Sequence, residues 1–558
     1  MNYTDLNREE LIAKLEENEK KLNDTTVEKE ELLKNSQRET EKSNELLNVI
    51  IPLGTALSAE KNLNNLFNKI LTGAMEICHA DGGTVYIKNG SKLDFKVIKN
   101  DSLNIHWNDE SYEKEDAFQS LSIFDEQTGE VNVNNVATLS ASNSETVNIK
   151  DAYQNTQFDF SGTKIFDKKN NFRSMSFLTV PLKNYSNNVI GVLQLINAKS
   201  ESTQKIIPFS QEKQTIVESL SSLAASALEN QMLLQAQKDL LDSFIRLISD
   251  GIDQKSPYTG GHCKRVPYIT ESLARAACSQ KEGTFSSFSL SIEEMYELKT
   301  AAWLHDIGKI TTPEYVVDKA TKLETIFDRV KLVESRYGIL RAEILNSSIN
   351  EDEKEVAFKK IESDLEFIKT SNIGGEFMTG EAKERVLEIS KTKYVNVYGE
   401  QENLLDEDEI LNLSIERGTL TQKEREIINN HIVVTIDMLE KLPLPEHLKR
   451  IPEYAGGHHE KMDGTGYPKG LTKEQMSIPA RMMAVADIFE ALTASDRPYK
   501  KGKKLSEAIK IMNFMRKDNH IDPEIFELFL KEKLYLPYAE KFLNKNQIDE
   551  VDIDSYLN

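Results

Sequence analysis

The chain has nine histidines, and five of them fall in four short segments between residues 262 and 459. These five are His262, His305, His431, His458 and His459. Two aspartates accompany them, because Asp306 follows His305 directly and Asp487 comes after the last histidine segment. Imidazole and carboxylate ligands suit iron, manganese or zinc. No cysteine belongs to these segments apart from one beside His262, which argues against a structural zinc site.

Both aspartates lie beside apolar, helix-like runs. Asp306 follows residues 301–304, and Asp487 follows residues 482–486. A buried carboxylate is costly unless it is paired or bound to a metal ion. One such residue is commonly a cap or an ion-pair partner, but two of them with five histidines predict shared cations. A pair of divalent ions lowers the pKa of a bound water to about 7, which supplies a nucleophile for phosphodiester hydrolysis.

The elements before these segments differ in character. Residues 1–45 lack Gly and Pro and are dense in Glu and Lys, which predicts a long charged helix or coiled coil. Residues 46–205 predict a helix-flanked antiparallel sheet, with an Asn89-Gly90 turn after the first strand. The expected strands span about 84–87, 93–98, 176–182 and 189–197.

Residues 206–248 predict a long linker helix. Nine positions from 220 to 248 alternate steps of three and four, and most of them are apolar. Asn230 and Gln237 are polar positions in this seam, and such residues fix the register of a parallel two-stranded coiled coil. The pattern therefore predicts a parallel homodimer. The alternative is a single amphipathic helix packed on the next domain.

Residues 46–205 resemble a GAF domain, a small-ligand sensor module. The resemblance depends on the strand Ser176–Leu182, the strand Gly191–Asn197 and the stretch Asp151–Asp167. Members bind cyclic nucleotides, tetrapyrroles or no known ligand, and many serve only in dimerisation. The resemblance implies a sensor domain, and the sequence does not identify its ligand.

Residues 249–558 resemble the HD-GYP family, a bacterial branch of the HD metal phosphohydrolases that hydrolyse cyclic di-GMP. The motifs are His305-Asp306-Ile307-Gly308-Lys309, His458-His459-Glu460-x-x-Asp463-Gly464-x-Gly466-Tyr467-Pro468 and Asp496-Arg497-Pro498-Tyr499. The expected fold is therefore a multidomain α+β chain. It comprises an α/β GAF-like sensor, a coiled-coil linker helix and an all-α HD-type phosphohydrolase domain.

The HD-GYP resemblance implies roles for individual residues. The expected metal ligands are His262, His305, Asp306, His431, His458, His459 and Asp487. Asp306 is expected to bridge two ions, Fe or Mn, and Lys309 is expected to act beside it as a second catalytic residue. Lys309, Tyr467, Arg497 and Lys500 are the expected substrate contacts. Glu460 and Asp463 are expected to orient ligand histidines, and Cys263 is expected in the core.

One position departs from the family pattern. Some members carry a Glu four residues before the first ligand histidine, where it helps to hold a third metal, and this chain has Tyr258 there. Tyrosine is a poor ligand at neutral pH because its pKa is near 10. Two metals are therefore expected, and linear pGpG rather than GMP is the expected main product.

Composition bounds the function further. The formal net charge of −22 disfavours DNA or long RNA as a ligand. No apolar run approaches the roughly 20 residues of a membrane span, and the first 20 residues lack a signal-peptide core. Three cysteines without paired spacing fit a reducing compartment. A cytoplasmic protein is expected.

Residues 319–418 interrupt the HD-GYP resemblance between the His-Asp pair and His431. Helix-like runs there predict a helical hairpin that acts as a lid, as a dimer contact or has no function of its own.

The leading prediction is a sensor-regulated phosphodiesterase that hydrolyses cyclic di-GMP and communicates with signalling partners. One alternative is a hydrolase of another cyclic dinucleotide. The other is a catalytically weak module that binds a cyclic dinucleotide or partner proteins without turnover. Loss of a ligand would favour that module, and all seven expected ligands are present.

Overall fold

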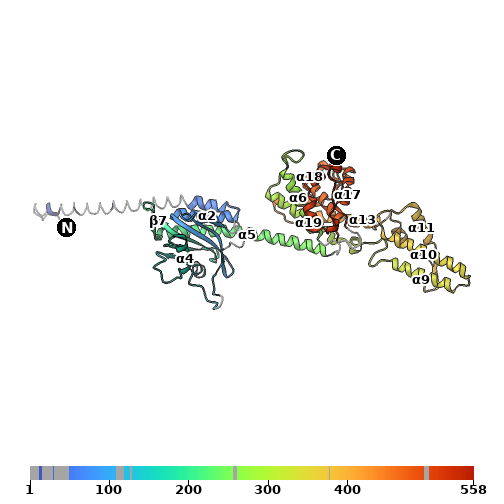
Figure 1. The fold of residues 1–558 in the computed structure, drawn as a ribbon, viewed down its shortest axis with the longest axis horizontal. Coiled ribbons are helices and arrows are strands. Elements are labelled where there is room, and N and C mark those ends of the chain that lie inside the picture. Colours follow the sequence, from blue (N-terminus) through green and yellow to red (C-terminus); the bar gives the residue numbers. More distant parts are fainter. Residues whose placement is uncertain are drawn as a thin grey trace, which may run out of the picture. The chain divides into compact units, whose positions relative to one another are not determined.

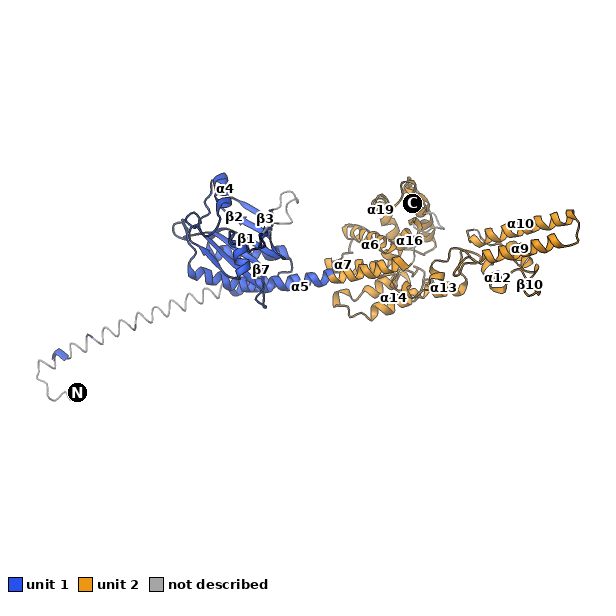
Figure 2. Ribbon diagram, turned by 90° about the horizontal axis from the view of Figure 1, so that it is seen from below, with its two compact units in different colours: residues 1–239 blue, residues 240–558 orange. Residues whose placement is uncertain are grey.

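The computed structural model divides the chain into two compact units, unit 1 (residues 1–239) and unit 2 (residues 240–558), which Figure 2 colours separately. The structure describes residues 12–14, 20, 29, 50–108, 118–125, 128–255, 261–375, 377–495 and 502–557. The predicted N-terminal helix over residues 1–45 therefore lies almost entirely outside the described residues. Within the described part, none of the helices combines the length and apolarity that crossing a bilayer requires.

Unit 1 is built on an antiparallel sheet with the strand order β3-β2-β1-β7-β6-β5 (Figure 1). Strand β4 adds to β2, and β8 adds to β7. The strands are β1 (Ala80–Asn89), β2 (Lys92–Asn100), β3 (Ile105–Asn108), β4 (Leu121–Ser122), β5 (Val147–Ile149), β6 (Phe177–Lys183), β7 (Val189–Lys199) and β8 (Ile206–Ile207). The helices are α2 (Leu63–Cys78), α3 (Val136–Asn143) and α4 (Ser161–Asn170). All four predicted strands and the flanking helices are confirmed.

The two faces of this sheet have separate apolar cores, because neighbouring residues of a strand point to opposite faces. Val85 of β1 packs with α2 and with the start of the long helix α5. The next residue, Tyr86, packs with α3 on the other face. Gly90 adopts a positive φ of 58° in the turn between β1 and β2, as the Asn-Gly pair predicts.

Helix α5 (Gln211–Lys255) is 45 residues long and confirms the predicted linker helix. Its first part packs in the core of unit 1, through residues such as Val217 and Leu228. Leu220 was predicted as a seam position, but it is fully buried in that same core and is not free to meet a partner helix. Further along, Leu234 and Leu241 are exposed.

Unit 2 is a helical bundle around one large apolar core, with Leu298, Tyr454 and Phe489 fully buried in it. Its helices are α6 (His262–Ser279), α7 (Ile292–Leu304), α8 (Glu314–Val317), α13 (Gln422–Asn429), α14 (His431–Glu440), α15 (Ile451–Gly456), α16 (Ile478–Thr493), α17 (Leu505–Lys517), α18 (Pro523–Lys531), α19 (Tyr535–Phe542) and α20 (Asp554–Leu557). Short 3₁₀ turns are η3 (Ile307–Thr311), η4 (Glu446–Leu448), η5 (Lys473–Gln475) and η6 (Lys545–Gln547).

The insertion over residues 319–418 has an apolar core of its own. Its two longest helices, α9 (Val330–Asn346) and α10 (Glu351–Ile373), lie side by side as the predicted hairpin (Figure 2). They are followed by α11 (Gly380–Ser390), β9 (Lys393–Val395), β10 (Gln401–Asn403) and α12 (Glu407–Leu413). The sequence did not predict the two-stranded hairpin β9–β10, whose strands are only three residues long.

Replacing Ile368 by Ala should destabilise the insertion, because this side chain is fully buried in the insertion core. The expected loss is about 2–5 kcal/mol of unfolding free energy, from lost burial and the cavity left behind. Ile326→Ala is the matched control, since Ile326 is 96% exposed in the same insertion. Its effect should stay within about 0.5 kcal/mol. Urea unfolding measures both, and equal stabilities would contradict the separate core.

Candidate metal centre

Six of the seven expected ligands lie at or near helix ends in unit 2, and Asp487 lies in the middle of a helix. His262 is the first residue of α6, and His431 is the first residue of α14. His305 ends α7 and Asp306 begins η3. The pair His458–His459 follows α15, and Asp487 lies within α16. Ligands from five separate segments of the chain thus meet in one region of the bundle.

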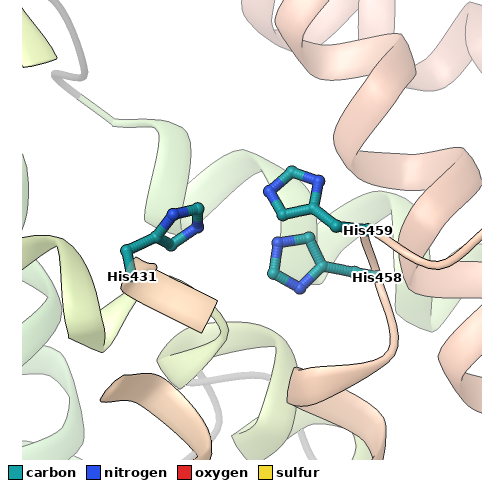
Figure 3. Close-up of side chains that lie close together, drawn as sticks. All are labelled: His431, His458 and His459. Carbon is teal, nitrogen blue, oxygen red and sulfur yellow. The ribbon is translucent and has the colours of Figure 1, made fainter. Parts of the chain in front are cut away.

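The structure brings all seven residues into overlapping groups, in each of which the ligand atoms lie within 4.8 Å of one another. One group holds three histidines that face one another in Figure 3. A second group combines two histidines with Asp487, and a third joins Asp306 to two histidines. In order, the groups are His431, His458 and His459; His262, His305 and Asp487; and His305, Asp306 and His458.

Asp306 lies between these groups and is 2% exposed. Its Oδ2 is 3.1 Å from Nε2 of His262 and 3.3 Å from Nε2 of His305. Its Oδ1 is 3.3 Å from Nε2 of His431. The ammonium of Lys309 lies 2.6 Å from Oδ2. The two oxygens of one carboxylate therefore face two different sets of histidines, which is the arrangement that a bridging ligand requires.

Three histidines share one hydrogen-bond pattern, in which Nδ1 donates to the backbone carbonyl three residues earlier. A carbonyl can only accept, so Nδ1 carries the proton and Nε2 keeps its lone pair. That tautomer presents Nε2 to a metal ion. The pairs are His305 with Ala302, His431 with Ile428 and His458 with Ala455.

His262 is oriented by the carboxylate of Glu490, a residue that the sequence did not predict for the site. Nδ1 of His262 lies 2.5 Å from Oε2 of Glu490, and Nε of Arg265 donates to Oε1 of Glu490 at 2.7 Å. Glu490 is fully buried on α16, one turn after Asp487. The signal was present in the sequence, because a Glu at i+3 from a buried Asp on an apolar helix faces the same side.

Several atoms of the expected ligands have no hydrogen-bond partner among the described residues, which fits a divalent ion. Oδ1 of Asp306 and Nε2 of His431 and His458 are buried without a hydrogen bond to any described residue. Buried polar atoms are rarely left unsatisfied, and such exceptions call for an explanation. A divalent cation supplies one, since imidazole and carboxylate groups are metal-ligand donors.

Two of the imidazoles are held in the neutral form that a metal ligand needs. Burial and the nearby His305 lower the pKa of His458 to about 3, so its imidazole is neutral at pH 7. Burial and His458 also lower the pKa of His459. Burial disfavours the charged form of His262, but Glu490 and Asp306 outweigh it and raise its pKa to about 10. The carboxylate cluster thus attracts positive charge even without a metal.

Gly308 allows η3 to lie against α14. A Cβ at this position would come within 2.0 Å of the carbonyl oxygen of His431 and 2.7 Å of the amide nitrogen of Thr435. The amide of Gly308 also donates to Oγ1 of Thr435 at 2.9 Å. Only glycine permits this approach, which brings Asp306 next to His431.

Glu460 and Asp463 were expected to orient ligand histidines, but in the structure their hydrogen bonds go to the loop after His459. The two oxygens of Glu460 accept from the backbone amides of Lys469 and Leu471. Asp463 accepts from the amide and hydroxyl of Thr465 and is exposed. Both carboxylates therefore shape the loop after His459, because its backbone amides need acceptors that no sheet or helix supplies.

The structure describes two of the remaining residues named in the sequence analysis, Tyr467 and Cys263. Tyr467 stacks on His459, with ring centroids 4.8 Å apart, so it lies at the centre. Cys263 is buried in the core as expected. Tyr258, Arg497 and Lys500 lie outside the described residues.

Comparison with protein families assigns both units. Residues 62–228 match the GAF domain, and residues 408–525 match the HD domain. The chain therefore carries a GAF domain and an HD domain, as the sequence predicted. The HD match includes His431, His458, His459 and Asp487, while the other three expected ligands lie before it.

Relatives with curated names are bacterial phosphodiesterases. A cyclic di-GMP phosphodiesterase of Pseudomonas aeruginosa is 54% identical over 74 residues, 13% of this chain and 17% of that protein. The 3'3'-cGAMP-specific phosphodiesterase 3 of Vibrio cholerae is 24% identical over 57% of this chain and 46% of its own length. A cyclic di-GMP phosphodiesterase of Thermotoga maritima is 39% identical over 20% of this chain and 30% of its own length. The chain thus spans less than half of each relative.

Among solved structures, the GAF domain of an Acinetobacter phosphoenolpyruvate-protein phosphotransferase aligns with 34% of this chain and 98% of that domain, at 15% identity and a TM-score of 0.26.

Replacing Glu490 by Ala should weaken metal binding by about 10–100-fold, because His262 loses the acceptor that orients it. Glu490→Gln keeps an acceptor oxygen and should lose less. Glu453→Ala, at an exposed carboxylate on α15, is the control. Calorimetric titration of the metal-free protein with Mn²⁺ compares the variants. An unchanged affinity in Glu490→Ala would show that Glu490 does not support the centre.

Proposed function

We propose that this chain, with its GAF and HD domains, is a metal-dependent phosphodiesterase that hydrolyses cyclic di-GMP to linear pGpG under the control of its GAF domain. The observation that carries the proposal is the position of Asp306 between two groups of histidines, with buried ligand atoms that have no other partner. We propose two Fe or Mn ions as the cofactors and the cytoplasm as the compartment. Free thiols at all three cysteines support a reducing compartment.

The residues of the proposed centre have different roles. The seven residues would hold the ions, with Asp306 placed to be shared, and backbone carbonyls and Glu490 orient the imidazoles that would face them. When bound, the ions supply a nucleophilic water at neutral pH and neutralise charge that develops on the phosphate oxygens. Lys309 adds a half-buried positive charge beside Asp306, where it can stabilise a phosphate group.

Tyr467 is the proposed substrate contact that the structure describes beside Lys309. Burial raises the pKa of the Tyr467 phenol, which therefore stays protonated and can donate a hydrogen bond to the substrate. Its ring packs against His459, which places it at the edge of the centre. We assign Arg497 and Lys500 to phosphate binding from the HD-GYP motif, since cationic side chains suit a dianionic dinucleotide.

A second candidate substrate is 3'3'-cGAMP. The relative from Vibrio cholerae that aligns with 57% of this chain is named as specific for that dinucleotide. The same ions and ligands would serve either reaction, because both substrates present the same phosphodiester linkages. The base contacts alone distinguish them.

Replacing Asp306 by Ala should abolish hydrolysis, because it removes the carboxylate shared between the two ion positions. The wild type should carry about two Fe or Mn ions per chain. The assay is incubation of metal-loaded protein with cyclic di-GMP, 3'3'-cGAMP and cyclic di-AMP, followed by chromatography of the products. Asp437→Ala, at an exposed carboxylate on α14, is the control and should keep full activity.

Two outcomes would contradict the proposed function. Activity that survives Asp306→Ala would remove the metal assignment. A wild type that binds its metals and a cyclic dinucleotide but releases no linear product would identify a binding module instead.

We also propose a parallel homodimer through α5. Beyond the part that packs in unit 1, this helix exposes apolar side chains at the predicted seam positions Leu234, Leu241 and Phe244. These residues are 51%, 37% and 52% exposed, which is costly for a helix that stays single in water. A second copy of the helix would cover them.

Replacing both Leu234 and Leu241 by Asp should convert the dimer into a monomer. Each new carboxylate would be buried in the seam, facing the same carboxylate on the second helix. Ala236→Asp, an exposed position of α5 outside the seam, is the control and should leave the dimer intact. Light scattering coupled to size-exclusion chromatography measures the mass. A wild type that is already monomeric would contradict the proposal.

A further inference from the structure

The last turns of α5 belong to the core of unit 2 and present one face to it. Ile245 and Ile252 of this face are buried in the large apolar core. Ser249 and Asp253 lie on the same face, at the helical spacing of three and four residues, and are also buried. A buried hydroxyl and a buried carboxylate on this face require partners.

Ser249 finds its partner at the end of α7. Its Oγ donates to the carbonyl oxygen of Trp303 at 2.7 Å. Trp303 lies two residues before the expected ligand His305. The hydrogen bond therefore ties α5 to the end of the helix that delivers His305.

Asp253 holds the start of α6. Its Oδ2 accepts from the amide of Gly261 at 2.9 Å, and its Oδ1 accepts from the amide of Cys263 at 3.5 Å. Gly261 is the N-cap residue of α6 and has no side chain to satisfy the first amides of the helix. Asp253 supplies that cap from another helix, on both sides of the expected ligand His262.

Lys255 holds the end of η3. Its ammonium donates to the carbonyl oxygens of Lys309, Ile310 and Thr312 at 3.1, 2.6 and 2.6 Å. All three ammonium protons are thus used on one turn of backbone. This turn follows directly on Asp306 and carries Lys309.

We propose that Ser249, Asp253 and Lys255 are positioning residues of the metal centre. They hold the backbone of the three segments that carry His262, His305 and Asp306, and all three lie within the last seven residues of α5. The same helix begins in the core of the GAF domain.

Lys255→Met tests this, because it removes the ammonium and keeps most of the apolar stem. Gln254→Met is the matched control, one residue earlier on the same helix and exposed. We expect Lys255→Met to weaken Mn²⁺ binding by about 10–100-fold in the full-length protein and to lower kcat more than KM. Gln254→Met should match the wild type in both.

Asp253 provides a second test that separates positioning from mere folding. Asp253→Leu removes both acceptors, whereas Asp253→Asn keeps one oxygen in the same place. We expect about a 10-fold or greater loss of Mn²⁺ affinity in the leucine variant and partial rescue in the asparagine variant, with helical content unchanged by circular dichroism. Equal Mn²⁺ affinity in wild type, Lys255→Met and Asp253→Leu would overturn the proposal, as would an equal loss in Gln254→Met.

The kinetic readout depends on the proposed phosphodiesterase function, but the Mn²⁺ titration does not. If the wild type binds Mn²⁺ and hydrolyses no dinucleotide, the proposed function fails, and the affinities of the variants still decide whether α5 positions the ligands.

Discussion

The carboxylate of Asp306 is buried among three imidazoles and one ammonium, and this single charge organises the centre around it. Removing a carboxylate from water is costly, and the cost is offset here by Lys309 at 2.6 Å and by histidines at 3.1–3.3 Å. Lys309 and His305 hold the pKa of Asp306 well below its usual range despite complete burial. The carboxylate therefore stays ionised, which a bridging metal ligand must be.

Backbone carbonyls near helix ends orient three of the histidines. Where a ligand follows or begins a helix, the carbonyl three residues earlier lies near a helix end and accepts the Nδ1 proton. The bundle thus fixes the tautomer of His305, His431 and His458 with main-chain atoms. His262 begins a helix whose preceding residue is a glycine in the left-handed region, so it takes Glu490 of α16 as its acceptor.

The remaining polar groups near the centre support backbone. Glu460 satisfies two amides of the loop that carries Tyr467, and Asp253 satisfies the first amides of α6. Lys255 does the same for the carbonyls of η3. Each of these three charges thus contacts the main chain next to an expected ligand or to a residue that stacks on one.

The sequence by itself determined the residue types of the centre, the strands of the GAF domain and the long helix, because these depend on local pattern and on motifs that short segments carry. It predicted Asp306 and Asp487 as ligands because burying an unpaired carboxylate in an apolar run costs free energy. Only the tertiary structure decided that Leu220 packs in its own domain, that Glu490 supports His262 and that Glu460 does not support a histidine. The physical reason is that hydrogen-bond partners such as Glu490 and His262 are 228 residues apart in the chain, and only packing of the helices brings them together.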